Sequence, residues 1–293
     1  MHFRRTSSRS RQSAARLPRS APNQGRHYYF RDYLGASERA RVLEFLTTIR
    51  PIWERRYPEG RPFPPGRTQR QLLRPVYWLG SWQFACLDYY RPPRQVRNRC
   101  VEAEPFPGVM AELLRDVEAR IRRLFPPADI PRGYRLNTCL VNFYGSRSEN
   151  GRELDTARVG EHRDFEPGPV ASLSLGERAL FQFVERQRVG EPTPPLLSQW
   201  LEDGSLQLFG GSLYKDRVLH RVQRVARNPE LDLPPRIAGF RTRRINFTFR
   251  FVPDEHVVPF ARLPEPARTY VAGYVRELAR GSVFFRQALE AAR

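Results

Sequence analysis

Residues 241–251 read RTRRINFTFRF, and from residue 244 onward polar and apolar side chains alternate. Successive side chains of a β-strand point to opposite faces, so this pattern predicts a strand with one apolar face suited to a core. That face comprises Ile245, Phe247, Phe249 and Phe251. The opposite face comprises Arg244, Asn246, Thr248 and Arg250. Buried guanidiniums require anionic partners, because an unpaired buried charge is costly. The strand therefore either holds a dicarboxylate ligand inside a barrel or is an edge strand whose arginines face water.

Further runs of strand character, separated by turn residues, fill the chain between residues 134 and 252. They are LNTCLVNFY (136–144), PVASLSL (169–175), ALFQFVE (179–185) and SLQLFGG (205–211). Five or more such strands favour an all-β sandwich or barrel. Helices are predicted outside these runs, at about 37–49, 110–125 and 266–292. We therefore predict an α+β fold with a mainly β core and flanking helices.

The 293-residue chain has 50 basic and 31 acidic residues, a formal net charge of +19. Such basicity predicts a polyanionic partner, most simply nucleic acid. Lys215 is the only lysine, so an arginine bias inherited from a GC-rich genome is the alternative explanation. No apolar run approaches the roughly 18 residues of a membrane-spanning helix, and no membrane association is expected. The three cysteines form no CxxC pair, which favours a reducing, cytoplasmic location over a disulfide framework or a cysteine zinc site.

The chain divides into four regions by composition. Residues 1–26 contain seven arginines and no acidic residue, which predicts a disordered basic arm; an organelle-targeting peptide is the alternative. Residues 27–133 are predicted to hold an N-terminal helix and an aromatic-rich region. The β core follows at 134–253, and a helical extension at 254–293.

Three residues suggest a metal site. His162 and Asp164 are two positions apart, and on an extended backbone such side chains share a face. His220 lies 56 residues beyond Asp164, shortly after a strand-like run. Two histidines and one carboxylate on one side of a metal leave other positions open, as in non-haem Fe(II) oxygenases. A His-x-Asp pair alone is weak evidence, because many surface strands contain one by chance.

Several motifs in order resemble the AlkB family of Fe(II)/2-oxoglutarate-dependent dioxygenases. They are Asn142-x-Tyr144, His162-x-Asp164, the segment PVASLSLG (169–176), His220, and Arg244-x-Asn246-x-Thr248-x-Arg250. The resemblance covers residues 134–252 closely and the aromatic region 68–92 loosely. It implies a double-stranded β-helix, or jelly-roll, with an N-terminal aromatic lid that recognises a nucleotide. The implied cofactors are Fe(II), 2-oxoglutarate as cosubstrate and O₂.

The resemblance also implies a role for individual residues. His162, Asp164 and His220 would bind Fe(II). Arg244 would pair with the distal carboxylate of 2-oxoglutarate, and Arg250 would help to hold its metal-proximal end. Hydrogen bonds to the cosubstrate would come from Asn142, Tyr144 and Asn246. Glu166 matches an acidic family position near the substrate base.

The implied reaction is oxidative demethylation of alkylated bases of the 1-methyladenine or 3-methylcytosine type in DNA or RNA. It would release succinate, CO₂ and formaldehyde. A base must leave its stack to reach a buried metal, and aromatic side chains hold flipped bases. The candidates for such stacking are Trp78, Trp82, Tyr89 and Tyr90. Candidate phosphate contacts are Arg67, Arg70, Arg74 and Arg163. The protein is expected to be a monomer.

One departure from the family pattern and three other functions stay open. The polar segment 145–160 is longer than the compact loop expected there, and it is either a flap that shapes the substrate site or an inert insertion. The same fold also supports dioxygenases that act on a protein or a small molecule. A catalytically silent nucleic-acid-binding module and an unrelated β-sandwich are the remaining alternatives.

Overall fold

The computed structural model describes residues 25–56, 70–82, 100–185, 194–223, 228 and 230–292. The predicted basic arm lies outside these residues except for its last two positions, and Arg26 begins the first strand. Tyr89, Tyr90 and Arg67 also lie outside the described residues.

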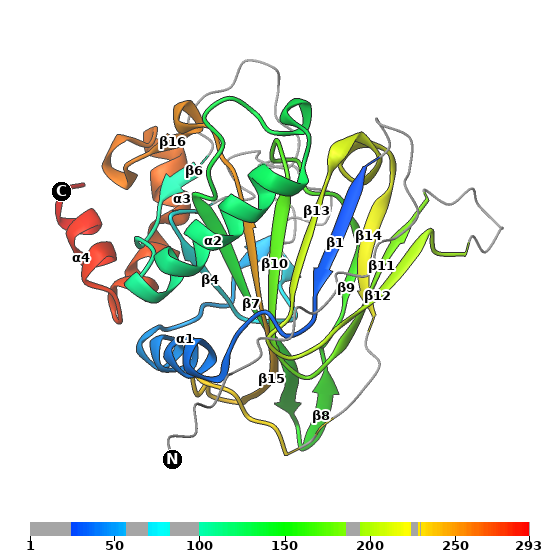
Figure 1. Cartoon of the computed structure of the whole chain (residues 1–293). Coiled ribbons are helices and arrows are strands. Elements are labelled where there is room, and N and C mark those ends of the chain that lie inside the picture. The colour runs from blue at the N-terminus through cyan, green and yellow to red at the C-terminus, as the bar shows by residue number, and fades with distance from the viewer. Residues whose placement is uncertain are drawn as a thin grey trace, which may run out of the picture.

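The main sheet has seven antiparallel strands in the order β1-β13-β10-β15-β7-β4, with β8 paired to β7 (Figure 1). Its strands are β1 (Arg26–Phe30), β4 (Val76–Leu79), β7 (Thr138–Glu149), β8 (Arg152–Asp155), β10 (Val170–Gly176), β13 (Leu206–Gly210) and β15 (Phe240–Arg250). The strand quoted first, β15, lies between β10 and β7. An edge strand with solvated arginines is therefore excluded.

A second sheet of four antiparallel strands has the order β12-β11-β14-β9. Its strands are β9 (Val159–His162), β11 (Ala179–Val184), β12 (Leu197–Leu201) and β14 (Leu219–Gln223). The two sheets form the jelly-roll predicted from the sequence. Strands β1 and β4 come from the region before residue 134, so the main sheet includes strands from outside the predicted core segment.

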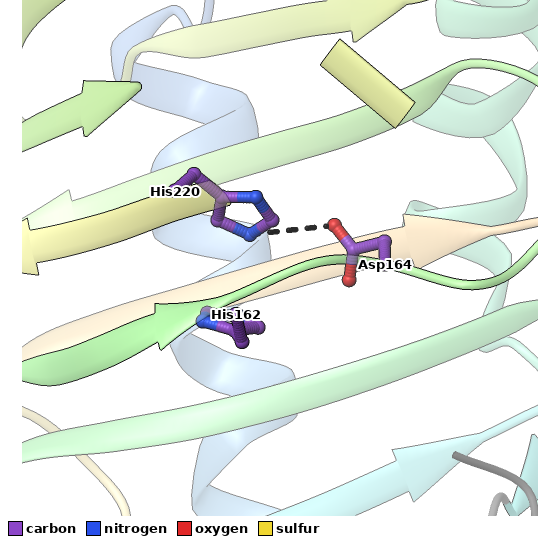
Figure 2. Close-up of side chains that lie close together, drawn as sticks. All are labelled: His162, Asp164 and His220. Atoms are coloured by element: carbon purple, nitrogen blue, oxygen red, sulfur yellow. Dashed lines mark ion pairs between the residues drawn. The ribbon is translucent and has the colours of Figure 1, made fainter. Parts of the chain in front are cut away.

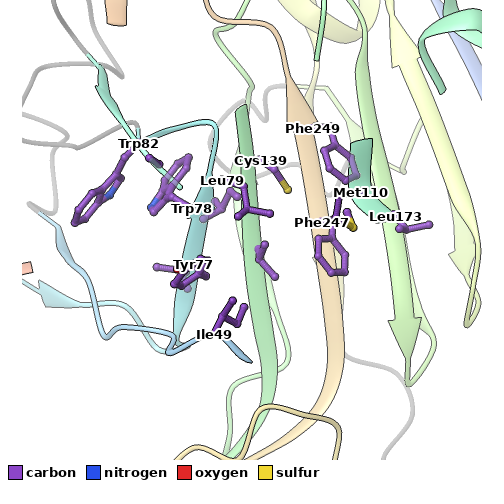
Figure 3. Close-up of a cluster of buried hydrophobic side chains, with 14 of the residues drawn as sticks. Ile49, Tyr77, Trp78, Leu79, Trp82, Met110, Cys139, Leu173, Phe247 and Phe249 are labelled. Atoms are coloured by element: carbon purple, nitrogen blue, oxygen red, sulfur yellow. The ribbon is translucent and has the colours of Figure 1, made fainter. Parts of the chain in front are cut away.

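Helices cover the outer face of the main sheet (Figure 1). They are α1 (Ala36–Thr48) and α2 (Gly108–Leu124). The buried side chains of α2 are Met110, Leu114, Val117 and Ile121, a spacing that places them on one face of a helix. They share a core cluster with Phe247 and Phe249 of β15 (Figure 3). The apolar face of β15 thus packs against helices, and its polar face is left to point between the two sheets.

The C-terminal extension contains two helices where the sequence predicted one. They are α3 (Glu265–Ala279) and α4 (Val283–Glu290). Between them, the Ser282 hydroxyl accepts a hydrogen bond from the Phe285 amide at 3.4 Å and caps the start of α4. The remaining short strands are β2 (Arg55–Arg56), β3 (Arg70–Gln71), β5 (Ser81–Trp82), β6 (Cys100–Glu102) and β16 (Val257–Val258).

Trp78 and Trp82 belong to this core, so the prediction that they stack on a substrate base is wrong. Their exposed fractions are 1% and 0%. Gly80, with φ of +74°, turns the chain between β4 and β5 and sends the two indoles inward (Figure 3). Trp82 packs edge-on against Tyr274 and Phe285 of the C-terminal helices, with ring centroids 5.9 and 6.1 Å apart. The many aromatic residues in this part of the sequence therefore include core residues.

The polar segment after Tyr144 is ordered as a hairpin. Strand β7 continues through it and turns at Asn150 and Gly151, whose φ angles of 49° and 72° suit a tight hairpin turn. The chain returns as β8, which pairs with β7.

Within the described residues, no helix is long and apolar enough to cross a membrane.

Replacing Trp82 with alanine tests its assignment to the core. The cavity left behind should lower the free energy of unfolding by about 3–5 kcal/mol. Chemical denaturation measures this, with Val283→Ala as the control, because Val283 on α4 is 59% exposed and its truncation should change little. Similar small effects of both substitutions would contradict the packing described.

Candidate metal and cosubstrate site

His162, Asp164 and His220 converge at one end of the smaller sheet (Figure 2). His162 and His220 are cross-strand partners on β9 and β14, with ring centroids 4.2 Å apart. One candidate ligand atom from each of the three residues lies within 4.8 Å of the others. The Nε2 atom of His220 is 3.5 Å from Oδ2 of Asp164. Antiparallel pairing thus brings together residues that are far apart in the sequence.

Asp164 reaches this position from a loop. Strand β9 ends at His162, so the expected continuous strand through both residues is absent. The guanidinium of Arg163 donates to the backbone carbonyl of Asp216, which fixes the loop against the turn before β14.

Both imidazoles are held in the neutral form that binds metals. Burial lowers the pKa of His162 and lowers that of His220 further, because the charged form loses its hydration. Nδ1 of His162 lies 2.8 Å from the carbonyl oxygen of Gly160. A proton on Nδ1 makes this hydrogen bond and leaves the Nε2 lone pair for a ligand.

Arg250 fixes the orientation of Asp164. Its Nη2 and Nε lie 2.6 and 2.8 Å from Oδ1 of Asp164. Burial alone would raise the pKa of Asp164, but the opposing charge of Arg250 holds it well below its usual range. Oδ2 is buried and has no hydrogen-bond partner among the described residues. An ionised oxygen left without a donor beside two neutral imidazoles fits a divalent cation.

Next to these residues, the polar face of β15 lines a cavity between the two sheets. His162, His220 and Arg250 line it together with the predicted cosubstrate residues Asn142, Tyr144, Arg244 and Asn246. Asn246 is oriented by its own hydrogen bonds, donating to Ser172 Oγ at 2.8 Å and to the Leu173 carbonyl at 3.1 Å. The structure therefore gathers all five residues that were predicted to bind the cosubstrate.

The side chain of Arg244 lines this cavity and is buried. Nη2 donates to Ser174 Oγ at 3.1 Å, and the guanidinium carbon lies 5.0 Å from the centre of the Tyr144 ring. Nε and Nη1 have no hydrogen-bond partner among the described residues. Burial lowers the pKa of Arg244, but a guanidinium stays charged in proteins. Two buried donors of a cationic group without protein partners fit an anionic ligand such as a carboxylate.

A third arginine of the cavity, Arg74, was predicted from the sequence only to contact phosphate. Arg74 donates from Nε to Oδ1 of Asn142 at 2.7 Å. Its guanidinium carbon lies 5.2 Å from the centre of the Tyr144 ring. Nothing in the sequence around residue 74 distinguishes it from the many other arginines, so its place in the cavity was not predictable.

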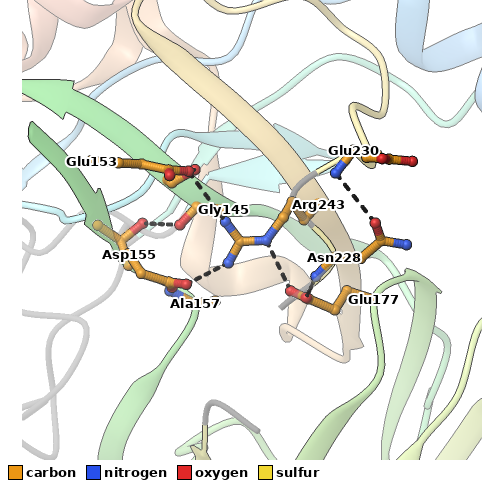
Figure 4. Close-up of polar contacts among 10 residues, drawn as sticks. Gly145, Glu153, Asp155, Ala157, Glu177, Asn228, Glu230 and Arg243 are labelled. Atoms are coloured by element: carbon orange, nitrogen blue, oxygen red, sulfur yellow. Dashed lines mark hydrogen bonds and ion pairs between the residues drawn. The ribbon is translucent and has the colours of Figure 1, made fainter. Parts of the chain in front are cut away.

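Arg243, the neighbour of Arg244, is fully buried on the other side of β15 (Figure 4). It pairs with Asp155 at 2.6 Å and with Glu177 at 3.1 Å. The register of β15 against β7 shifts between Thr242 and Arg244, which allows adjacent arginines to point away from each other. Arg243 thereby fastens the β7–β8 hairpin and the turn after β10 to the strand that carries Arg244.

Glu166 and Phe165 follow Asp164 in the same loop. Glu166 is buried, with Oε1 at 3.5 Å from Nε of Arg250. Phe165 is 49% exposed, and no sequence pattern distinguishes it from the other phenylalanines among the 19 in the chain.

Comparison with known proteins identifies the family. The sequence profile of the 2OG-Fe(II) oxygenase superfamily matches residues 26–250. The chain belongs to this superfamily. No curated protein sequence matches it significantly.

Solved structures also match this chain. The structure of OsALKBH1 matches with 20% identity and a TM-score of 0.46, over 77% of this chain and 97% of that chain. The structure of YcfD, a ribosomal oxygenase from Escherichia coli in complex with cobalt and succinic acid, matches with 14% identity and a TM-score of 0.27. That match covers 62% of this chain and 46% of the other.

Membership confirms the predicted type of enzyme and its cofactors. The protein is an oxygenase that uses Fe(II), 2-oxoglutarate and O₂. The donor set of His162, Asp164 and His220 suits Fe(II), since two imidazoles and a carboxylate are the ligands expected for such iron sites.

Replacing His162 with alanine should lower the affinity for a divalent cation by more than about tenfold, because loss of a ligand costs at least as much as loss of its supporting contacts. Titration of the metal-free protein with Co(II), followed by visible absorption, measures this. His256→Ala is the control, since His256 is remote in sequence from the triad and belongs to the short helix Asp254–His256. Unchanged Co(II) binding by the His162 variant would contradict the assignment.

Proposed function

We propose that this protein is an AlkB-type dioxygenase that oxidatively demethylates alkylated bases in DNA or RNA. The observation that carries the proposal is the inward polar face of β15, where Arg244 presents two unpaired donors beside the His162–Asp164–His220 triad. The basic composition, with a net charge of +19, supports a nucleic-acid substrate over a neutral small molecule.

In this proposal, Fe(II) is held by the two imidazoles and by Oδ2 of Asp164. Arg250 keeps that carboxylate ionised and correctly turned through its contacts with Oδ1. When bound, Fe(II), 2-oxoglutarate and O₂ would supply the oxidising chemistry, which couples decarboxylation to succinate and CO₂ with hydroxylation of the N-methyl group. The hydroxylated group leaves as formaldehyde and restores the base.

The other residues of the cavity orient the cosubstrate. Arg244 pairs with its distal carboxylate, and Arg250 lies beside the metal-proximal end. Asn142, Tyr144 and Asn246 supply hydrogen-bonding groups along its length. Arg74 adds a positive charge at the Asn142 side chain and so favours an anionic ligand there.

The substrate base would approach the loop that carries Asp164. Phe165 is an exposed aromatic side chain directly between Asp164 and Glu166, and a flipped base can stack on such a ring. Phe165 therefore replaces Trp78 and Trp82 as the described candidate for stacking. Tyr89 and Tyr90 stay predictions.

Arg244→Ala should raise the KM for 2-oxoglutarate by roughly 10- to 100-fold, because charged hydrogen bonds to the cosubstrate are lost. Steady-state succinate formation at varied 2-oxoglutarate concentration measures the change. Arg241→Ala is a matched control, since Arg241 lies on the same strand but is exposed. An unchanged KM for the Arg244 variant would remove this residue from the cosubstrate site.

The substrate class is tested by succinate release and mass spectrometry with methylated and unmethylated oligonucleotides of DNA and RNA. Stimulation by oligonucleotides that contain 1-methyladenine or 3-methylcytosine, with loss of the methyl group, is the expected result. Turnover that no oligonucleotide changes would instead indicate a protein or small-molecule substrate. Nucleic-acid binding without any turnover would indicate a silent binding module.

A further inference from the structure

Lys215 is the one lysine in a chain with 50 basic residues, and it lies beside the triad. It belongs to a π-helical turn, Leu213–Arg217, that leads directly into β14 and His220. Such turns are rare and often occur at functional sites. An ammonium group at this position stands out, because every other cationic side chain except the histidines is a guanidinium.

The turn is held firmly on both sides of Lys215. The ring of Tyr214 packs on that of Phe183, with centroids 4.1 Å apart. The carbonyl of Asp216 accepts a hydrogen bond from the Arg163 guanidinium. Because Arg163 immediately precedes Asp164, this bond places Lys215 next to the loop that holds Asp164 and Glu166.

The charged groups around Lys215 leave one donor and one acceptor without partners. Arg250 contacts Oδ1 of Asp164 and Oε1 of Glu166. Oδ2 of Asp164 faces His220, at the proposed metal. Among the described residues, the buried Nζ of Lys215 and Oε2 of Glu166 have no hydrogen-bond partner. Burial lowers the pKa of Lys215, and the nearby carboxylates of Asp164 and Glu166 oppose this and favour its ammonium form.

These two groups do not line the cosubstrate cavity. The cavity lined by Arg244 is bounded by His162 and His220, and neither Lys215 nor Glu166 lines it. Lys215 and Glu166 are therefore not assigned to cosubstrate binding, and they adjoin the loop that carries Asp164. A buried donor and a buried acceptor left open there match a ligand that offers one of each.

We propose that Lys215 faces the substrate base and donates a hydrogen bond to a ring carbonyl oxygen next to its methylated nitrogen. Glu166, at the acidic family position expected near the base, would accept from the amino group on the other side. This inference rests on the proposed function. In 3-methylcytosine the methylated nitrogen lies between a carbonyl and an amino group. In 1-methyladenine the amino group is present, but the other neighbour is a C–H group that accepts no hydrogen bond. Lys215 therefore selects 3-methylcytosine over 1-methyladenine.

Charge does not explain this selection. Both methylated bases are cationic near neutral pH, so the ammonium repels both and its repulsion cancels in a ratio of their rates. The carbonyl is the difference that remains at the reacting edge. A buried donor that finds no acceptor weakens binding of the wrong base by roughly tenfold or more.

The test uses the full chain with Fe(II) and 2-oxoglutarate and two single-stranded oligonucleotides that differ only in one base, 3-methylcytosine or 1-methyladenine. Mass spectrometry of the demethylated products gives kcat/KM for each. The wild-type protein should favour 3-methylcytosine, and Lys215→Met should lower the ratio of the two kcat/KM values by roughly tenfold. Lys215→Gln keeps an N–H donor and should keep most of the ratio.

Arg217→Met is the matched control, because Arg217 is an exposed cation of the same turn and its loss should leave the ratio unchanged. A wild-type preference for 1-methyladenine, or an unchanged ratio in Lys215→Met, would overturn the role of Lys215 while leaving the demethylase intact. Demethylation of neither oligonucleotide by the wild-type protein would overturn the proposed function as well. Thermal unfolding of each variant shows whether it is folded. If Lys215→Met is not folded, Lys215→Ala replaces it, and its ratio of the two kcat/KM values should again be lower than that of Lys215→Gln.

Discussion

The pairing of Arg250 with Asp164 is the interaction on which the site depends. A buried carboxylate without a partner would take up a proton and could no longer bind a cation. Arg250 prevents this, since two of its nitrogens lie within 2.8 Å of Oδ1. Only Oδ2 is then left to face the histidines. Arg250 is the last residue of β15 in the main sheet, and Asp164 lies in the loop after β9 of the smaller sheet. Their ion pair therefore also connects the two sheets.

The alternation of polar and apolar side chains along β15 links the site to the rest of the fold. Its phenylalanines pack into the cluster under α2, which fixes the direction of the opposite face. Arg244, Asn246 and Arg250 then have to point between the sheets, where only a charged or polar ligand can complete their hydrogen bonds. Arg243 reinforces the arrangement from the other side by tying down the β7–β8 hairpin. A one-residue slip of the register would exchange the two faces and place the guanidiniums in the apolar core.

Much of the site was predictable because residue type and spacing carry direct chemical meaning. His162, Asp164 and His220 could be selected from five histidines and the carboxylates near them, and Arg244 and Arg250 from a strict two-residue period. Side chains whose role depends on tertiary packing could not be selected in this way. Trp78 and Trp82 are of a residue type common on recognition surfaces, but they lie in the core. Arg74, Arg243 and Phe165 lie in no motif. The break between α3 and α4 was also missed, although Gly281 and the capping Ser282 are local signals that end one helix and begin another.

A crystal structure of the protein with Mn(II) and 2-oxoglutarate, prepared without oxygen, tests the central claim most directly. One ion should bind to His162, to His220 and to Oδ2 of Asp164, with Arg250 still paired to Oδ1. The distal carboxylate of 2-oxoglutarate should contact the guanidinium of Arg244. An ion bound elsewhere, or a cosubstrate that leaves Arg244 without a contact, would contradict the arrangement described.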